Sequence, residues 1–305
     1  MRSFNPEYLF PSHTKPLSGA EVMETLTLYR DAIQYVHDQT IRLMNKGFYP
    51  DQIIEMIELP ETIAKSPFVN EFYGTVRWSV KSIFNGYLGW FNGNISDLDP
   101  LSRAEEAERF SRLVGGEAVL FSELEKAVEG RDMQWALQLS DRLIALNYKN
   151  EETRKLRAEA ARSIGEESPN PNKRNYLLSA ANEMDPRYKE GLLLPQTEGL
   201  LREISIDMFF DILAVRLNPE KMEPGEFRVC FSFTSGIKKS ITLRNSVAEI
   251  SSLNVDCDIE VESEDQVFKE MLAGIRNPIF TVTSGKINTN GNAASFLSFL
   301  SKFSD

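Results

Sequence analysis

The chain has 305 residues, with 34 lysines and arginines against 45 aspartates and glutamates, which gives a formal net charge of -11. This length allows two domains, and the acidic balance disfavours nucleic acid as a partner because phosphate backbones would repel the chain. A composition of 42% hydrophobic and 26% charged residues is typical of a globular protein and excludes collagen-like repeats and wholesale disorder. No apolar run approaches the roughly 18–20 residues that a membrane span requires.

The histidine and cysteine counts limit the chemistry further. The sequence has two histidines, His13 and His37, whereas catalytic zinc sites take three protein ligands that are usually rich in histidine. Two cysteines, Cys230 and Cys257, are too few for a disulfide scaffold, and both lie in alternating apolar stretches, so we expect buried thiols. Residues 1–11 lack the apolar core of a signal peptide, and as the sequence stands a cytoplasmic location is expected.

The first part of the chain predicts a loop followed by helices. Residues 1–17 contain three prolines without periodicity, which is typical of a loop segment rather than a folded unit. Ser18 and Glu21 have the spacing of a capping box, and apolar residues then recur every three or four positions, so we expect a long helix that Gly47 ends. Pro50 opens a short second helix.

Residues 68–91 form an unusually aromatic segment that predicts a helix apolar on nearly all sides. Such a helix is buried on more than one side, so it is either the centre of a helical domain or part of a subunit interface. Its polar side chains Tyr73, Asn85 and Tyr87 need partners if they are buried. They either make hydrogen bonds in the core or face a pocket for an amphiphilic or anionic ligand.

Residues 102–184 give further helical patterns, with breaks at 115–116, 130–132, 147–150 and 168–171. We expect an antiparallel helical layer, loosely similar to a tetratricopeptide array but without a repeat of fixed period.

The composition shifts after Asp185, and residues 192–195 are the candidate linker. Two short helices are expected at about 197–217, and alternating apolar residues then predict strands, which with helices around them indicate an α+β domain. Its phenylalanine-rich inner faces enclose either a packed core or an apolar cavity. The expected strands lie at 227–233, 241–243, 255–261 and 280–282, with helices at 263–273 and after Gly291.

The two histidines differ in their local setting. His37 lies at the edge of the apolar stripe of the first helix, where a structural, hydrogen-bonded histidine is expected. His13 lies in a proline-flanked loop, where composition alone favours a solvated side chain.

Three runs of sequence resemble the alkyl sulfatases of the metallo-β-lactamase fold, bacterial and fungal enzymes that hydrolyse dodecyl sulfate and related primary alkyl sulfates. The runs are Tyr29–Gly47, Tyr73–Val80 and Asn85–Asn94. Residues 190–305 resemble the C-terminal domain of that family, which is similar to sterol carrier proteins. The resemblance implies an N-terminal loop segment at 1–17, an all-helical dimerisation domain at 18–188, and a sterol-carrier-like α+β domain at 189–305.

The family's catalytic module carries an HxHxDH zinc motif and carboxylate ligands, and these do not occur in this sequence. The resemblance implies that His13 is a metal ligand only if the missing module completes the site, and that Tyr87 or Tyr73 contacts the sulfate. It further implies a homodimer, zinc in the complete enzyme, a separate catalytic module as a partner, and an alkyl sulfate or fatty-chain amphiphile as the ligand. A full-length relative can be periplasmic or secreted.

Two hypotheses follow from the resemblance. In the first, the chain supplies dimerisation through the aromatic helical domain and alkyl-chain binding through the sterol-carrier-like domain to an alkyl sulfatase, with no hydrolysis by this polypeptide alone. In the second, it is a non-catalytic dimeric protein that binds lipid or surfactant.

Overall fold

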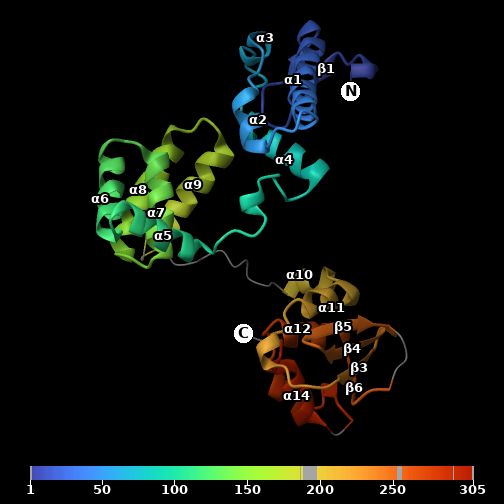
Figure 1. The fold of residues 1–305 in the computed structure, drawn as a ribbon. Helices are drawn as coiled ribbons and strands as arrows, with labels where there is room; N and C mark the ends of the chain where they lie inside the picture. The colour runs from blue at the N-terminus through green and yellow to red at the C-terminus, as the bar shows by residue number, and fades with distance from the viewer. Residues whose placement is uncertain (1, 186, 188–197, 253–255, 291, 304–305) are drawn as a thin grey trace. The chain divides into compact units, whose positions relative to one another are not determined.

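In the computed structural model the chain divides into two units, Met1–Gly191 and Leu192–Asp305 (Figure 1). The structure describes residues 2–185, 187, 198–252, 256–290 and 292–303. The first unit is built of helices and the second of a mixed sheet with helices, which confirms the predicted fold class. The predicted boundary at residues 188 and 189, and the candidate linker at 192–195, lie outside the described residues.

The N-terminal segment is more ordered than a loop. Tyr8–Leu9 (β1) pairs antiparallel with Leu17–Ser18 (β2). The predicted capping box is therefore wrong, because Ser18 is part of this ladder and the helix begins one residue after Gly19. Gly19 has a φ of 64°, a conformation that favours glycine, and its N–H donates to Glu7 O at 2.9 Å.

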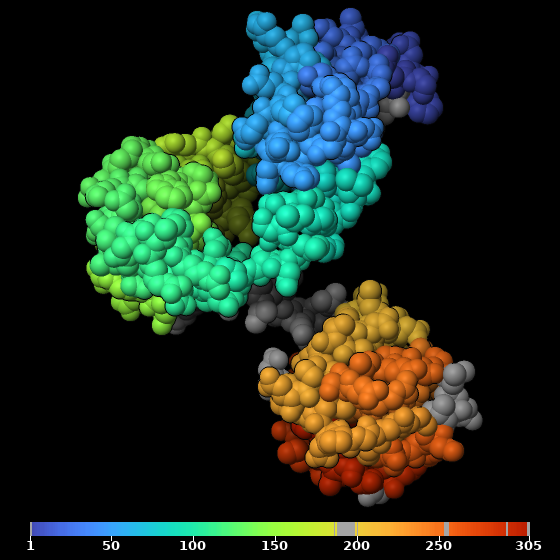
Figure 2. Space-filling model, in the orientation of Figure 1, coloured from blue at the N-terminus to red at the C-terminus, as the bar shows by residue number. Residues whose placement is uncertain are grey.

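The first helix and its neighbours form a small core of their own. Helix α1 ends at Met44, and Gly47 closes the turn after it with a φ of 84°, as predicted. Side chains from α1, α2 and α4 meet in an apolar cluster that includes Val36, Ile53, Val80 and Phe84. The helices of this part are α1 (Ala20–Met44), α2 (Pro50–Met56), α3 (Glu61–Ala64) and α4 (Val76–Leu88). Figure 2 shows the blue N-terminal residues and the cyan residues of α4 lying against each other.

The prediction of one helix over residues 68–91 is wrong for the residues before Val76 and for those after Leu88, where Gly89 ends α4 with a φ of 83°. Thr75 caps α4 because its side chain accepts a hydrogen bond from Trp78 N at 3.0 Å, and residues 68–75 form turns. Burial is also one-sided, since Val80 is 0% exposed whereas Tyr87 is 62% exposed. Within the described chain, α4 therefore leaves an aromatic face uncovered.

The predicted helical layer is confirmed, and each predicted break separates two helices. Successive helices pack on one another, with Leu124, Leu139 and Ala160 at the centre of their shared core. The helices are α5 (Arg103–Val114), α6 (Glu117–Glu129), α7 (Met133–Ala145), α8 (Asn150–Glu167) and α9 (Pro171–Glu183). Among the described residues, no helix is long and apolar enough to cross a membrane.

The second unit is a five-stranded sheet in the order β5-β4-β3-β6-β7, in which β3 and β6 run parallel and the other neighbours antiparallel. Alternate residues of a strand face opposite sides, so Val229, Phe231 and Phe233 share one face, against which α11, α12 and α14 pack phenylalanines. The interior is a packed core. The strands are β3 (Phe227–Phe233), β4 (Lys238–Arg244), β5 (Val247–Ser251), β6 (Ile259–Ser263) and β7 (Ile287–Asn288). The helices are α10 (Glu198–Glu203), α11 (Ile206–Ala214), α12 (Asp265–Leu272), α13 (Pro278–Thr283) and α14 (Ala293–Ser301).

Two strand predictions differ from the structure. Residues 280–282 belong to helix α13, because Asn277 accepts from Phe280 N at 3.0 Å as the cap and Pro278 occupies the first helical position. The strand expected from residue 255 begins at Ile259, and Val255 lies outside the described residues.

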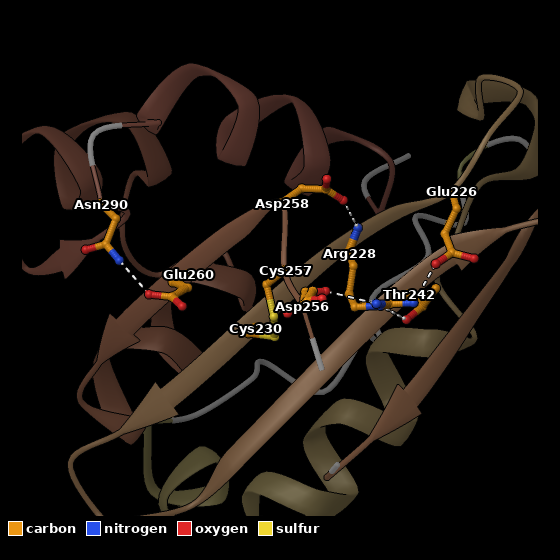
Figure 3. The surroundings of a disulfide bond; sticks show 9 residues. All are labelled: Glu226, Arg228, Cys230, Thr242, Asp256, Cys257, Asp258, Glu260 and Asn290. Carbon is orange, nitrogen blue, oxygen red and sulfur yellow. Dashed lines mark hydrogen bonds and ion pairs between the residues drawn. A yellow bond between two sulfur atoms is a disulfide. The ribbon is translucent and has the colours of Figure 1, made fainter. Parts of the chain in front are cut away.

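The expectation of two buried thiols is wrong, because Cys230 and Cys257 form a disulfide (Figure 3). The parallel pairing of β3 with β6 brings the segment before β6 beside Cys230, and the two Cα atoms lie 5.8 Å apart, within the usual range for a disulfide. Arg228 fixes the same segment, because its backbone N–H donates to Asp258 Oδ2 at 2.7 Å and its side-chain Nη1 donates to Asp256 O at 2.9 Å.

Candidate functional site

An open groove of about 1060 Å³ lies in the first unit. It lies among the β1–β2 hairpin, α1, the turns at residues 67–75 and α4. Its lining is largely apolar, and both histidines of the chain contribute to it. We call it the α1 groove. Pockets that bind small molecules share this combination of an apolar lining with a few polar groups.

His13 and Tyr73 lie together at the groove, although 60 residues separate them in the sequence. Their ring centroids are 4.8 Å apart and the rings are tilted by 39°. Both side chains line the groove and both are exposed to solvent. Among the described residues neither the imidazole of His13 nor the hydroxyl of Tyr73 has a hydrogen-bond partner, so both can contact a ligand.

His37 and Tyr87 form a second histidine–tyrosine pair between α1 and α4. His37 Nε2 lies 3.0 Å from the Tyr87 hydroxyl, and His37 Nδ1 lies 2.9 Å from Asp38 Oδ1. If Nδ1 carries the proton and donates it to the carboxylate, Nε2 of the neutral ring accepts from the tyrosine. Hydrogen bonds from His37 and then Gln34 lower the pKa of the Asp38 carboxyl below its ordinary value. Of this pair only His37 lines the groove, and its expected structural role agrees with these bonds.

The turns that carry Tyr73 are held by helix α9. Asn170, which is 3% exposed, donates from Nδ2 to Glu71 O at 2.8 Å and to Gly74 O at 3.4 Å. Asn172 donates to Tyr73 O at 2.7 Å. In the sequence these asparagines indicate only a break between two helices. The Asn-Pro-Asn run signals a cap, but nothing local in the sequence indicates contacts across nearly a hundred residues.

The residues of the groove do not by themselves fit a zinc ion. Zinc sites take three or four protein ligands, and in the described part of the chain no group of three or more His, Cys, Asp or Glu side chains lies close enough to hold a metal. His13 can supply one ligand and no more. The structure therefore supports no metal-dependent step performed by these residues alone.

Two family models match the chain in succession. The model described as alkyl sulfatase dimerisation matches residues 49–186, and the one described as alkyl sulfatase C-terminal matches residues 195–305. The first falls on the helical unit and the second on the sheet unit.

Named relatives agree with these matches. A linear primary-alkylsulfatase from Pseudomonas sp. is 34% identical, over 99% of this chain and 60% of its own length. The alkyl/aryl-sulfatase BDS1 of Saccharomyces cerevisiae is 28% identical, over 98% of this chain and 47% of its own length. The solved structure of the stereoselective inverting sec-alkylsulfatase Pisa1 from Pseudomonas sp. superposes with a TM-score of 0.84 at 25% identity, over 98% of this chain and 48% of that one.

This chain thus spans 60% of the first relative and about half of the others. Two family models cover the two units of the chain, and these relatives align along nearly all of it. The chain therefore belongs to the alkyl sulfatase family and comprises the dimerisation and C-terminal domains of that family.

Proposed function

We propose that the chain supplies dimerisation and alkyl-chain binding to a hydrolase of primary alkyl sulfate esters, while residues outside this chain carry the zinc chemistry. The observation that carries the proposal is the match of the dimerisation and C-terminal family models to the two units, together with a relative described as a linear primary-alkylsulfatase. The domains are taken as residues 1–17, 18–188 and 189–305, with the first as the boundary to a catalytic module.

Dimerisation is supported by the uncovered face of α4 and the residues after it. Tyr87, Leu88 and Trp90 are 62%, 60% and 73% exposed, and large exposed apolar side chains of this kind mark protein interfaces. Leu88→Glu with Trp90→Glu should convert a homodimer into a monomer in light scattering at micromolar concentration. Val247→Glu, an equally exposed apolar position in the second unit, is the control and should stay dimeric. A wild-type chain that is monomeric contradicts this part of the proposal.

Catalysis is assigned to a separate module. We expect that zinc and dodecyl sulfate added to this polypeptide release no sulfate above the blank. Adding the part of the Pseudomonas primary-alkylsulfatase that lies outside the aligned region should restore turnover, with His13 as one metal ligand and Tyr73 or Tyr87 contacting the sulfate. Metal-dependent turnover by this chain alone contradicts the proposal.

The alternative is a dimeric protein that binds lipid or surfactant without catalysis. The lack of a metal-binding group among the described residues favours it as the second candidate. The same complementation experiment separates the two, because the alternative predicts amphiphile binding and no turnover with any added module.

A further inference from the structure

A second pocket of the first unit lies among helices α4, α7, α8 and α9, all of which contribute to its lining. We call it the α9 pocket, because helix α9 supplies more of its lining residues than any other element. Its volume is about 430 Å³, near the lower end of the roughly 300–1,000 Å³ that small-molecule pockets occupy. A space of this size suits a compact ligand of one or two rings.

Two aromatic side chains line the α9 pocket, Trp78 from α4 and Tyr176 from α9. They are 43% and 78% exposed, and within the described part of the chain neither ring lies against another aromatic ring. Ile164 and Leu177 add aliphatic surface. Aromatic side chains whose faces are free stack favourably on a flat ring. The apolar part of the pocket therefore suits a planar aromatic ligand.

The charge in the α9 pocket has one sign. Lys173 is the only charged side chain among the described residues that line it, and its ammonium group has no ion-pair partner in the described chain. The side-chain amide of Gln134 and the hydroxyl of Tyr176 likewise have no hydrogen-bond partner among the described residues. A lysine ammonium is a compact point charge that attracts an anion. The pocket therefore complements a carboxylate attached to the ring.

Hydrogen bonds hold the polar side of the pocket in place before any ligand binds. Lys173 and Asn172 lie in the first turn of α9, and the Lys173 N–H donates to Asn170 Oδ1 at 3.0 Å. Asn172 Nδ2 donates to Tyr73 O at 2.7 Å, which joins the same turn to the residues before α4. A ligand that enters a site already held in this way loses little affinity to ordering the protein.

We propose that the α9 pocket binds a small planar aromatic carboxylate. The ring lies against Trp78 and Tyr176, and the carboxylate lies at Lys173. Trp78 also lines the α1 groove, but the charged and hydrogen-bonding groups of the α9 pocket do not. The proposal does not rest on the proposed function, because it involves neither a sulfate ester nor an alkyl chain.

The test is calorimetric titration of the full chain with 2-naphthoate and two analogues. Naphthalene-2-carboxamide keeps the rings and lacks the charge, whereas trans-decahydro-2-naphthoate keeps the charge and lacks the aromatic faces. We expect saturable binding of one 2-naphthoate per chain, and about threefold or more weaker binding of each analogue. No saturable binding of 2-naphthoate at millimolar concentration, or equal affinity for either analogue, would overturn the proposal.

A pair of lysine variants tests the charge. Lys173→Gln and Lys155→Gln each remove one exposed lysine from a helix, and Lys155 does not line the pocket. We expect Lys173→Gln to weaken 2-naphthoate binding about threefold or more and to leave naphthalene-2-carboxamide binding unchanged, because only the carboxylate uses the charge. Lys155→Gln should change neither affinity. Equal weakening of both ligands by Lys173→Gln, or of neither, contradicts the assignment of the carboxylate to Lys173.

A pair of tyrosine variants tests the aromatic wall. Tyr176 and Tyr8 are 78% and 63% exposed, so both alanine variants should fold, and Tyr8 does not line the pocket. We expect Tyr176→Ala to weaken 2-naphthoate binding about fivefold or more, through the loss of stacking and of apolar contact. Tyr8→Ala should bind as the wild type does. Equal affinities of the two variants would place the ligand elsewhere and overturn the proposal.

Discussion

Asn170, the residue that caps α9, holds the backbone of Glu71, with its side-chain Nδ2 2.8 Å from the Glu71 carbonyl oxygen. The same side chain accepts from Lys173 N at 3.0 Å through Oδ1 and so also begins helix α9. One buried residue therefore couples the helical layer to the turns that present Tyr73 to the groove.

Replacing Asn170 should destabilise the first unit. Asn170→Ala leaves two carbonyl groups and the start of α9 without their partner, and we expect a loss of about 1–3 kcal/mol in the free energy of unfolding. Asn172→Ala, at an exposed position, should cost about 1 kcal/mol or less. Urea unfolding followed by helical circular dichroism measures both. A smaller effect for Asn170→Ala than for Asn172→Ala would contradict this account.

The disulfide should contribute strongly to the stability of the C-terminal unit. Cys230 and Cys257 are 27 residues apart, and closing a loop of that length stabilises by about 3–4 kcal/mol in the chain-entropy account. Reduction of the wild-type chain should lower the unfolding midpoint of this unit, while Cys257→Ser should have the low midpoint with or without reductant. Thiol titration of the non-reduced, unfolded protein should find no free thiol; two free thiols would contradict the structure.

Tyr73 and Tyr87 should differ in their effect on ligand binding. Tyr73→Phe removes a donor that faces the groove and should weaken dodecyl sulfate binding about tenfold or more, as expected for a hydrogen bond to a charged group. Tyr87→Phe removes a hydroxyl that contacts His37 and does not line the groove, so affinity should stay within twofold or so of wild type. The reverse order in a calorimetric titration would assign the sulfate contact to Tyr87.

The Asp38 carboxyl gives a pH-dependent prediction. Its pKa is lowered from 3.8 by hydrogen bonds from His37 and Gln34. A carboxyl with a lower pKa in the folded state stabilises the fold above its unfolded pKa, and that contribution is lost as the pH falls through the folded value. NMR titration should place the Asp38 midpoint below 3.8, and His37→Ala should move it upward. His13→Ala is the control and should leave the midpoint unchanged.

Local signals explain which parts of the fold the sequence predicts. Glycine pairs, asparagines and prolines mark the ends of the helices between residues 102 and 184, and each marker acts on its own neighbours. Where two local signals compete in the same segment, the sequence pattern does not decide which structure forms. Phe280 and Val282 alternate like a strand, but the Asn277 cap and Pro278 determine the helix. Thr75 likewise begins α4 inside a segment whose aromatic composition suggests one continuous helix.

The site depends on contacts that no local signal reveals. The disulfide forms because β3 pairs in parallel with β6. The β1–β2 ladder, which forms one wall of the groove, lies in a segment whose sequence predicts a loop. The resemblance points to His13, Tyr73 and Tyr87. Only the fold shows that the Tyr73 ring packs against the His13 ring, whereas the Tyr87 hydroxyl lies within hydrogen-bonding distance of His37.

The Asn170 contacts also bear on how the molecule can be dissected. A fragment cut after α4 would retain every side chain that lines the groove and yet lose the amide that braces its turns. The smallest autonomous piece that keeps the groove intact should therefore extend through α9, even though no described residue of the helices in between lines the groove.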